Sequence, residues 1–280
     1  MQRGLWNQSG FRRLREVLCG VLIGAGAILP GISGGVLAVI FGIYRPFMEL
    51  LTHPLQGIAK YSNWFLPLAV GWCIGFLGFA KGIAAALDVS GTATTWLFIG
   101  LIVGTLPQLM QEAGKNGRSA ASGVSFLACA LVAFGVLFYV SRIVHVSVTP
   151  NFWWYTFCGA LWGISAVIPG LASSSVLMGL GLYQPMLEGV AQLQLSVLSA
   201  ALPGMLLTIV LLARGVNRLF QRHYAVAFHG VLGFVLASTL TIIPVYYQSG
   251  REIALSVLCC AGGFALAFAL ARLETRIQPL

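Results

Sequence analysis

The chain is poor in charge. Only 8% of its 280 residues are Asp, Glu, Lys or Arg, whereas 58% are hydrophobic. A soluble domain needs a polar surface, and about a quarter of its residues are typically charged. This shortage excludes an ordinary soluble protein and indicates a chain that lies in a lipid bilayer.

Acidic residues are the scarcer of the two charged types. Seven Asp and Glu stand against sixteen Lys and Arg, which gives a formal net charge of +9. Such an excess suits an anionic cytoplasmic leaflet or an anionic substrate. Most of it is explained by topology alone, because basic residues collect in cytoplasmic loops.

The sequence also lacks the signatures of an enzyme. Its four histidines are scattered, no paired carboxylates appear on one segment, and no HExxH, GxSxG or P-loop motif occurs. The six cysteines lie in apolar stretches and have neither metal-ligand spacing nor the pattern of an extracellular disulfide framework. We therefore expect no catalytic residue, no metal site and no cofactor, and nucleic-acid binding has no support beyond net charge.

What the chain does contain is a duplication. A shift of 139 residues aligns 19–49 with 158–188 without a gap, and 11 of the 31 positions are identical. Chance would give roughly three identities in so apolar a composition. Most of the identities fall on Gly, Pro, Tyr and Glu rather than on interchangeable aliphatic residues. They include Pro30 with Pro169, Tyr44 with Tyr183, and Glu49 with Glu188.

Three apolar stretches follow each copy. Each stretch is long enough to span the roughly 30 Å hydrocarbon core as a helix. A weaker match between the two halves, at a shorter offset, supports the same division. Lys81-Gly82 in the first half resembles Arg214-Gly215 in the second, and each pair ends an apolar segment. We expect two repeats, 1–150 and 151–280. The stretches lie near 64–80, 94–111 and 122–141 in the first repeat, and near 193–213, 226–247 and 252–271 in the second.

The duplicated segment is an apolar hairpin that is broken at its centre. The first hairpin, 17–51, is interrupted by Pro30-Gly31-Ile32-Ser33-Gly34-Gly35, and the second, 153–190, by Pro169-Gly170-Leu171-Ala172-Ser173-Ser174-Ser175. Proline removes a backbone donor and clashes with the preceding turn, and glycine lowers helix propensity, so the helix should break there. Neither half of a hairpin spans the bilayer alone. The alternative is a proline-kinked helix that crosses once and packs through small residues.

Re-entrant hairpins would leave three crossings between the two copies, so the halves would be inverted, as in many transporters. Both termini would then be cytoplasmic, with twelve basic residues inside and three outside, Arg45 uncounted. If each hairpin crossed once, the count would be eleven to four, which separates the two models only weakly. We expect an all-α polytopic membrane protein with an inverted repeat, each half a re-entrant broken hairpin plus three transmembrane helices.

The two breaks form the candidate site. Irregular backbone at membrane depth survives only where it is buried in protein or lines a wet cavity. A helix that starts after a Gly- or Ser-rich break presents free N–H groups to an anion. Arg45, Glu49 and Glu188 are the charges inside or bordering the hairpins, and they are either functional or interface anchors. The expected substrate-binding residues are Gly31, Ser33, Gly34, Gly35, Arg45, Glu49, Ser173, Ser174, Ser175 and Glu188.

From Pro30 to Gly35, and on to Gly42-Ile43-Tyr44, the chain resembles the bacterial and archaeal membrane family long known as domain of unknown function 368. Members of that family are identified as undecaprenyl-phosphate translocases of PopT type. The resemblance covers nearly the whole chain, through its length, the PGxSGG break, the later Pro-Gly-Leu copy and the Gly-x-Tyr-x-Pro ends. The second hairpin departs from the first, since Ala172-Ser173-Ser174 replaces Ser-Gly-Gly and Gln184 stands in place of Arg45.

The resemblance implies a multi-pass flippase of the bacterial inner membrane, with membrane lipids around it. It would return undecaprenyl phosphate from the outer to the inner leaflet for envelope precursor synthesis. The residues alone lead only to an anion site between inverted repeats. They leave open a transporter of a small soluble anion and, as a different class, a membrane enzyme acting on a lipid phosphate.

Overall fold

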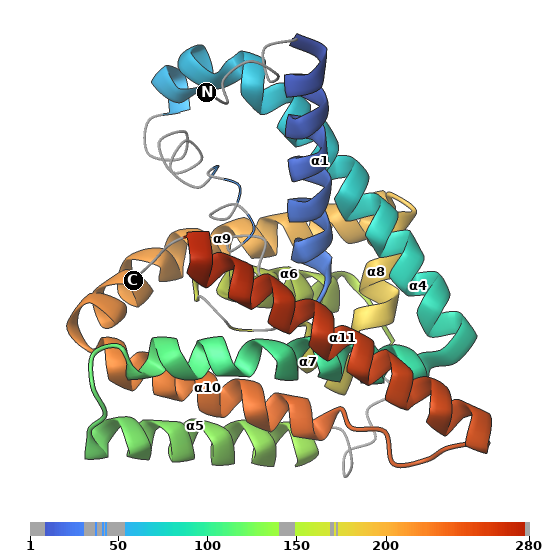
Figure 1. Cartoon of the computed structure of the whole chain (residues 1–280), viewed down its shortest axis with the longest axis vertical. Helices are drawn as coiled ribbons and strands as arrows, with labels where there is room; N and C mark the ends of the chain where they lie inside the picture. Colours follow the sequence, from blue (N-terminus) through green and yellow to red (C-terminus); the bar gives the residue numbers. More distant parts are fainter. Residues whose placement is uncertain are drawn as a thin grey trace.

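The computed structural model describes residues 9–30, 37, 41, 43, 54–139, 149–168, 171 and 173–277. Within these residues every regular element is a helix (Figure 1), which confirms the all-α fold class. The helices are α1 (Ser9–Ile28), α4 (Pro54–Gly114), α5 (Ala120–Phe138), α6 (Phe152–Val167), α7 (Ser173–Gly179), α8 (Tyr183–Ala191), α9 (Leu195–Arg222), α10 (Tyr224–Thr241) and α11 (Gly250–Ile277).

Five of these helices are long and apolar enough to cross a membrane, which fits a multi-pass membrane protein. The longest candidate span, Trp64–Gly114, has 51 residues. A straight helix of that length would measure about 75 Å, more than twice the hydrocarbon thickness. The span is interrupted at Ser90, so it holds the two apolar stretches that the sequence places near 64–80 and 94–111. The other four spans are Ala120–Phe138, Leu195–Arg222, Tyr224–Thr241 and Gly250–Leu273.

Ser90 ends one helical segment of α4 and begins the next. Its backbone is extended, with φ −157° and ψ 92°, and its hydroxyl oxygen accepts a hydrogen bond from the backbone N–H of Ala93 at 3.3 Å. This is the geometry of a helix N-cap. The Thr94 hydroxyl reaches back across the turn and donates to the carbonyl of Ala86 at 3.0 Å. The chain doubles back at this point (Figure 1), so α4 consists of two separate helical segments.

Glycines bring α1 and the first segment of α4 into backbone contact. A Cβ on Gly20 would overlap the carbonyl oxygen of Leu68, and one on Gly24 would overlap that of Trp72. Both helices advance by four residues between these two contacts, so they run parallel. Such close approach gives extensive van der Waals contact in a bilayer, where water does not drive helices together.

The second half of the chain makes the same contact. A Cβ on Gly159 of α6 would overlap the carbonyl oxygen of Ala201 in α9, and one on Gly163 would come within 2.7 Å of the carbonyl oxygen of Met205. Gly159 and Gly163 follow Gly20 and Gly24 by 139 residues. Ala201 and Met205 follow their counterparts in α4 by 133, which is also the offset of the Lys81 and Arg214 match. Thus α6 and α9 repeat the parallel packing of α1 and α4.

The remaining helices pair between the two halves. The second segment of α4 packs against α11, where Gly100 approaches the backbone of Cys260. In the same way α10 packs against α5, where Gly233 approaches the backbone of Phe126. Gly100 and Gly233 are again 133 residues apart, and Phe126 and Cys260 are 134 apart. In each of these two pairs a helix of one half packs against a helix of the other (Figure 1).

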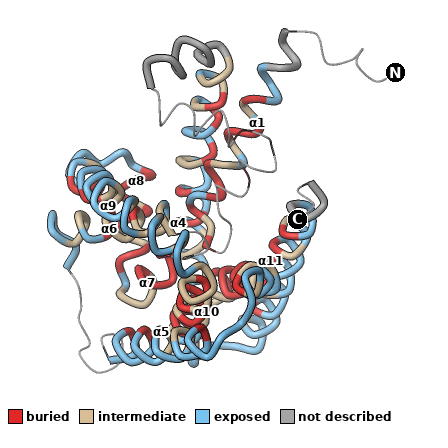
Figure 2. The backbone as a smooth tube through the Cα atoms, turned by 90° about the vertical axis from the view of Figure 1, so that its left-hand side faces the viewer, coloured by how far each residue is buried: buried red, intermediate tan, exposed pale blue. Residues whose placement is uncertain are grey.

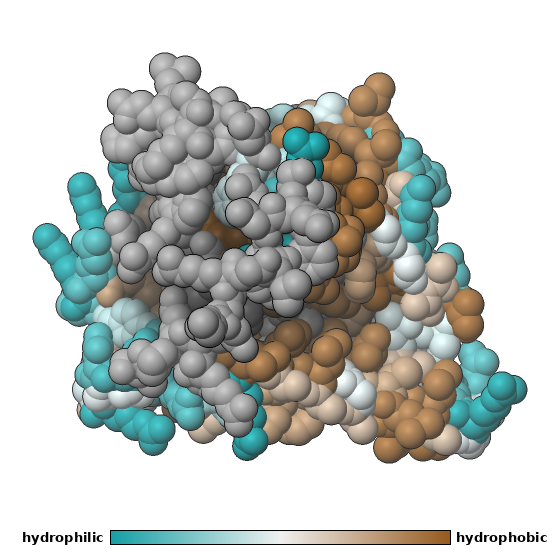
Figure 3. Space-filling model, turned by 45° about the horizontal axis from the view of Figure 1, so that its top comes forward, coloured by the Kyte–Doolittle hydropathy of each residue, from teal (hydrophilic) through white to brown (hydrophobic). Residues whose placement is uncertain are grey.

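The largest buried core lies where the second hairpin meets α1 and α4. Leu177 of α7, Leu182 just before α8, and Met186 and Leu187 of α8 are fully buried in it, beside Phe98 of α4. Figure 2 shows buried segments of α4, α7 and α10 at the centre of the molecule. Figure 3 shows hydrophobic residues over a broad part of the surface and hydrophilic ones at its left and right edges, as expected for a protein that faces lipid tails.

Candidate functional site

The structure describes four of the ten expected binding residues, all in the second hairpin. Ser173, Ser174 and Ser175 begin α7, and Glu188 lies on α8. The other six lie outside the described residues: Gly31, Ser33, Gly34, Gly35, Arg45 and Glu49.

The second hairpin breaks where the sequence predicts. The helix α6 ends at Val167, and Ile168 is extended, with φ −99° and ψ 109°. The next residue in the sequence is Pro169, and a proline ring disfavours the helical conformation at the residue before it by steric clash. The chain resumes as a helix at Ser173, whose backbone N–H donates to the Ser165 hydroxyl oxygen of α6 at 3.0 Å. This bond ties the start of α7 to the last turn of α6.

The three serines are all buried, and one of them is unsatisfied. Ser175 has 0% of its surface exposed, and its hydroxyl has no hydrogen-bond partner in the part of the chain that the structure describes. A buried hydroxyl without a partner typically costs about 1–3 kcal/mol. Such a group marks a position where a polar ligand atom would be stabilised. Because α7 has only seven residues, the hydroxyls, rather than a helix terminus, distinguish this position.

A polar bridge joins the second hairpin to the turn of α4. The Gln184 side-chain nitrogen donates to Asp88 Oδ1 at 2.7 Å and to Glu188 Oε1 at 2.9 Å. Asp88 comes two residues before the cap at Ser90. The sequence marks Gln184 only as a departure from Arg45, and Asp88 is absent from the expected site. The Asp-x-Ser-Gly pattern at 88–91 signals a helix start, but nothing in it links Asp88 to a side chain 96 residues away.

Tyr183 connects the second hairpin to the first helix. Its hydroxyl donates to the backbone carbonyl of Ile28, the last residue of α1, at 3.0 Å, and both residues are buried. Gly181, two residues before it, has φ +70°, a left-handed conformation that glycine adopts without strain. The repeated Gly-x-Tyr pattern thus has a physical role in this hairpin, because the glycine makes the turn that directs the tyrosine onto α1.

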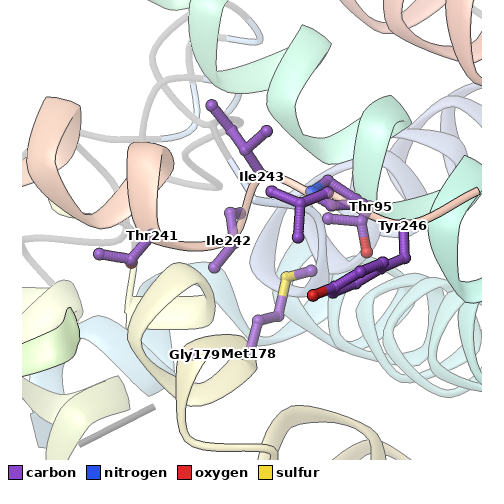
Figure 4. A pocket seen from close by; sticks show the side chains of 9 residues that line it. Thr95, Met178, Gly179, Thr241, Ile242, Ile243 and Tyr246 are labelled. Carbon is purple, nitrogen blue, oxygen red and sulfur yellow. The ribbon is translucent and has the colours of Figure 1, made fainter. Parts of the chain in front are cut away.

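A cavity of about 380 Å³ opens at the C-terminal end of α7. Three segments that are distant in the sequence line it: Thr95 of α4, Met178 and Gly179 of α7, and Thr241 with the following residues 242–246. Figure 4 shows the side chains of Met178 and Tyr246 pointing toward one another. Sequence patterns gave no signal for this cavity, because its walls come together only in the folded chain.

Residues 23–255 match a protein-family model described as undecaprenyl phosphate translocase-like. A curated protein of Vibrio cholerae serotype O1, named polyprenyl-phosphate transporter, is 24% identical over 245 residues. The aligned region covers 82% of this chain and 78% of that protein. No solved structure gives a significant match.

Proposed function

This chain belongs to the undecaprenyl phosphate translocase-like family, and on that premise we propose that it carries undecaprenyl phosphate from the outer to the inner leaflet of the cytoplasmic membrane. The returned lipid would serve envelope precursor synthesis. The observation that carries the assignment of a phosphate site is the fully buried hydroxyl of Ser175, which has no partner within the described residues.

Helix direction supports re-entrant hairpins. A hairpin that crossed the membrane once would deliver the chain to the other side, and the next helix would run antiparallel to the first half of the hairpin. The contacts of Gly20 and Gly24 run in parallel along α1 and α4, and those of Gly159 and Gly163 do so along α6 and α9. Parallel pairs are expected if each hairpin enters and leaves on the same side.

Helix direction also supports inversion of the repeats. Gly100 and Gly104 of α4 approach the backbones of Cys260 and Phe264 of α11, so these two helices run parallel. After α4 the chain turns at 115–119 and returns as α5 in the opposite direction (Figure 1). The third helices of the two halves, α5 and α11, would therefore point opposite ways, which favours an inverted repeat over a parallel one.

The basic turns suggest which end faces the cytoplasm. Lys115 and Arg118 follow α4, and Arg218 and Arg222 end α9. The Tyr224 hydroxyl at the start of α10 donates to the Glu112 carboxylate, which brings the two turns to the same end of the molecule. By the positive-inside rule this end is cytoplasmic. Asp88 and Glu188, with the cavity beside α7, would then face the outer leaflet, and both termini would lie inside.

In this proposal the hydroxyls of Ser173, Ser174 and Ser175 donate to the phosphate oxygens, which are strong acceptors. The first hairpin would add donors from Gly31, Ser33, Gly34 and Gly35. Arg45 would balance the negative charge, and Glu49 and Glu188 would orient it or carry a coupled proton. Such a polar site lowers the desolvation cost of moving a phosphate through hydrocarbon, while the polyprenyl tail stays in lipid.

Leaflet-resolved transport of labelled undecaprenyl phosphate in proteoliposomes tests the function. We expect the purified protein to move the lipid between leaflets and inorganic phosphate to be transported poorly. Transport of inorganic phosphate without any need for a polyprenyl tail would instead identify a soluble-anion transporter. Release of inorganic phosphate from the lipid would identify an enzyme.

A further inference from the structure

We propose that the cavity beside α7 holds the isoprenoid units nearest the phosphate while the headgroup lies at the serines of the second hairpin. This inference rests on the proposed function, in which the substrate is a polyprenyl phosphate. It adds a hydrocarbon subsite to the phosphate site and gives the transporter a means of recognising the tail.

The described lining of the cavity has the chemistry of a hydrocarbon site. None of its residues carries a charge, and its loop wall is Ile242, Ile243, Pro244, Val245 and Tyr246. The Thr95 hydroxyl donates to the carbonyl of Gly91 at 2.7 Å, and the Thr241 hydroxyl donates to that of Ser238 at 2.8 Å. Both threonine hydroxyls therefore already donate to backbone carbonyls, and an apolar occupant would break neither of these hydrogen bonds.

The cavity continues the face of α7 that carries the serines. Residues three and four apart lie on the same side of a helix. Ser174 and Ser175 thus lie one turn before Met178 and Gly179, which line the cavity. Ser175 and Gly179 are separated by a rise of only about 6 Å. A lipid whose phosphate contacts Ser175 would bring its first isoprene units to the cavity.

The volume of the cavity suits part of a tail rather than a whole one, and a hydrogen bond holds one of its walls against α4. Its volume of about 380 Å³ falls at the small end of ligand pockets. That volume accommodates a few branched five-carbon units, so the rest of a long tail would extend into the bilayer. Trp96 of α4 donates from Nε1 to the Tyr247 hydroxyl at 3.1 Å, which ties the loop wall to α4.

Gly179 allows the cavity to be filled without disturbing the fold. A Cβ added there would meet only Thr241 Oγ1, at 3.9 Å, and its φ is not in the left-handed region. Gly179→Leu should therefore extend a side chain toward the cavity. Gly262→Leu is the matched control, because a Cβ at that α11 position would meet nothing within 4 Å and the residue is exposed.

The test uses the full chain in proteoliposomes with a polyprenyl phosphate that carries a photoactivatable diazirine in its first isoprene units. We expect crosslinks to map to Met178 or to residues 242–246. Gly179→Leu should lower these crosslinks, and the transport of the lipid, by roughly tenfold, while Gly262→Leu leaves both unchanged. Farnesol, which has the tail chemistry without the phosphate, should compete for crosslinking in the wild-type protein even if Gly179→Leu fails to fold.

The outcomes separate this inference from the proposed function. If wild-type protein transports the lipid but crosslinks map elsewhere, or farnesol does not compete, the subsite is wrong and the function stands. Equal labelling of the cavity by a diazirine phospholipid would show that ordinary membrane lipid occupies it, which also overturns the subsite. If wild-type protein moves no polyprenyl phosphate, the proposed function itself fails.

Discussion

At the scale of single residues, a substitution at Ser175 should weaken substrate binding without lowering the stability of the fold. Its hydroxyl is buried without a partner in the described residues, so Ser175→Ala removes an unsatisfied group and should leave the melting temperature unchanged or slightly higher. If the hydroxyl donates to a phosphate, its loss should weaken substrate binding by about 1.5–3 kcal/mol, or roughly 10- to 150-fold.

The measurement is the flipping rate at low lipid concentration together with thermal unfolding of the purified protein. Ser199→Ala is the control, because that serine is exposed on α9 and its hydroxyl donates only to the nearby Ser196 carbonyl. Unchanged transport in Ser175→Ala would remove the hydroxyl from the phosphate site.

Tyr183 should behave in the opposite way and affect stability. Tyr183→Phe keeps the ring, which packs edge-on against Phe98, but leaves the buried carbonyl of Ile28 without its bond. We expect a loss of about 1–3 kcal/mol in the free energy of unfolding, measured as a lower melting temperature in detergent. Tyr139→Phe, at an exposed position, should change little. Equal melting temperatures for the two variants would mean that the bond does not hold α1 to the second hairpin.

At the scale of helices, the glycine contacts predict where side chains are forbidden. A Cβ on Gly159 would overlap the carbonyl oxygen of Ala201, so Gly159→Ala should force α6 and α9 apart. Overpacking of this kind costs about 1–3 kcal/mol, and we expect lower melting temperature and yield. Gly20→Ala should have a similar effect, because its contact with α4 is equivalent. Gly215→Ala, where a Cβ meets nothing within 4 Å, is the control. Alanine favours a helix more than glycine does, so no loss is expected there. An equal loss at Gly215 would mean that the backbone contact is not the cause.

The helices and the break were predictable because they follow from local chemistry. Apolar length marks the membrane spans, and Pro169-Gly170 marks the end of α6. The partners of the helices were not predictable, since every span is apolar and hydropathy does not distinguish one neighbour from another. The same limit applies to the site. Serines after a break could be named from the sequence, whereas the bond from Gln184 to Asp88 depends on how α8 packs against α4.

At the scale of the whole molecule, the inverted topology can be tested by labelling. In a cysteine-free background, Ser147→Cys, between the halves and outside the described residues, should react with an impermeant maleimide in intact cells. Arg118→Cys, in the basic turn between α4 and α5, should react only after permeabilisation, since positive residues mark the cytoplasmic side. If Ser147→Cys also needs permeabilisation, the six-crossing model with two re-entrant hairpins is wrong.

The exchange of helix contacts between the halves also bears on how the protein is made and how it arose. While the chain is being synthesised, Gly100 of α4 enters the membrane long before Cys260 of α11 exists, so this pairing waits for the complete chain. A half-length fragment would present its glycine-lined helix faces to lipid. Two such fragments inserted in opposite orientations would cover each other's glycine-lined helix faces. If the halves are inverted as proposed, an unfused ancestor of each half would have been a dual-topology dimer, and fusion of its two copies would have fixed one orientation for each.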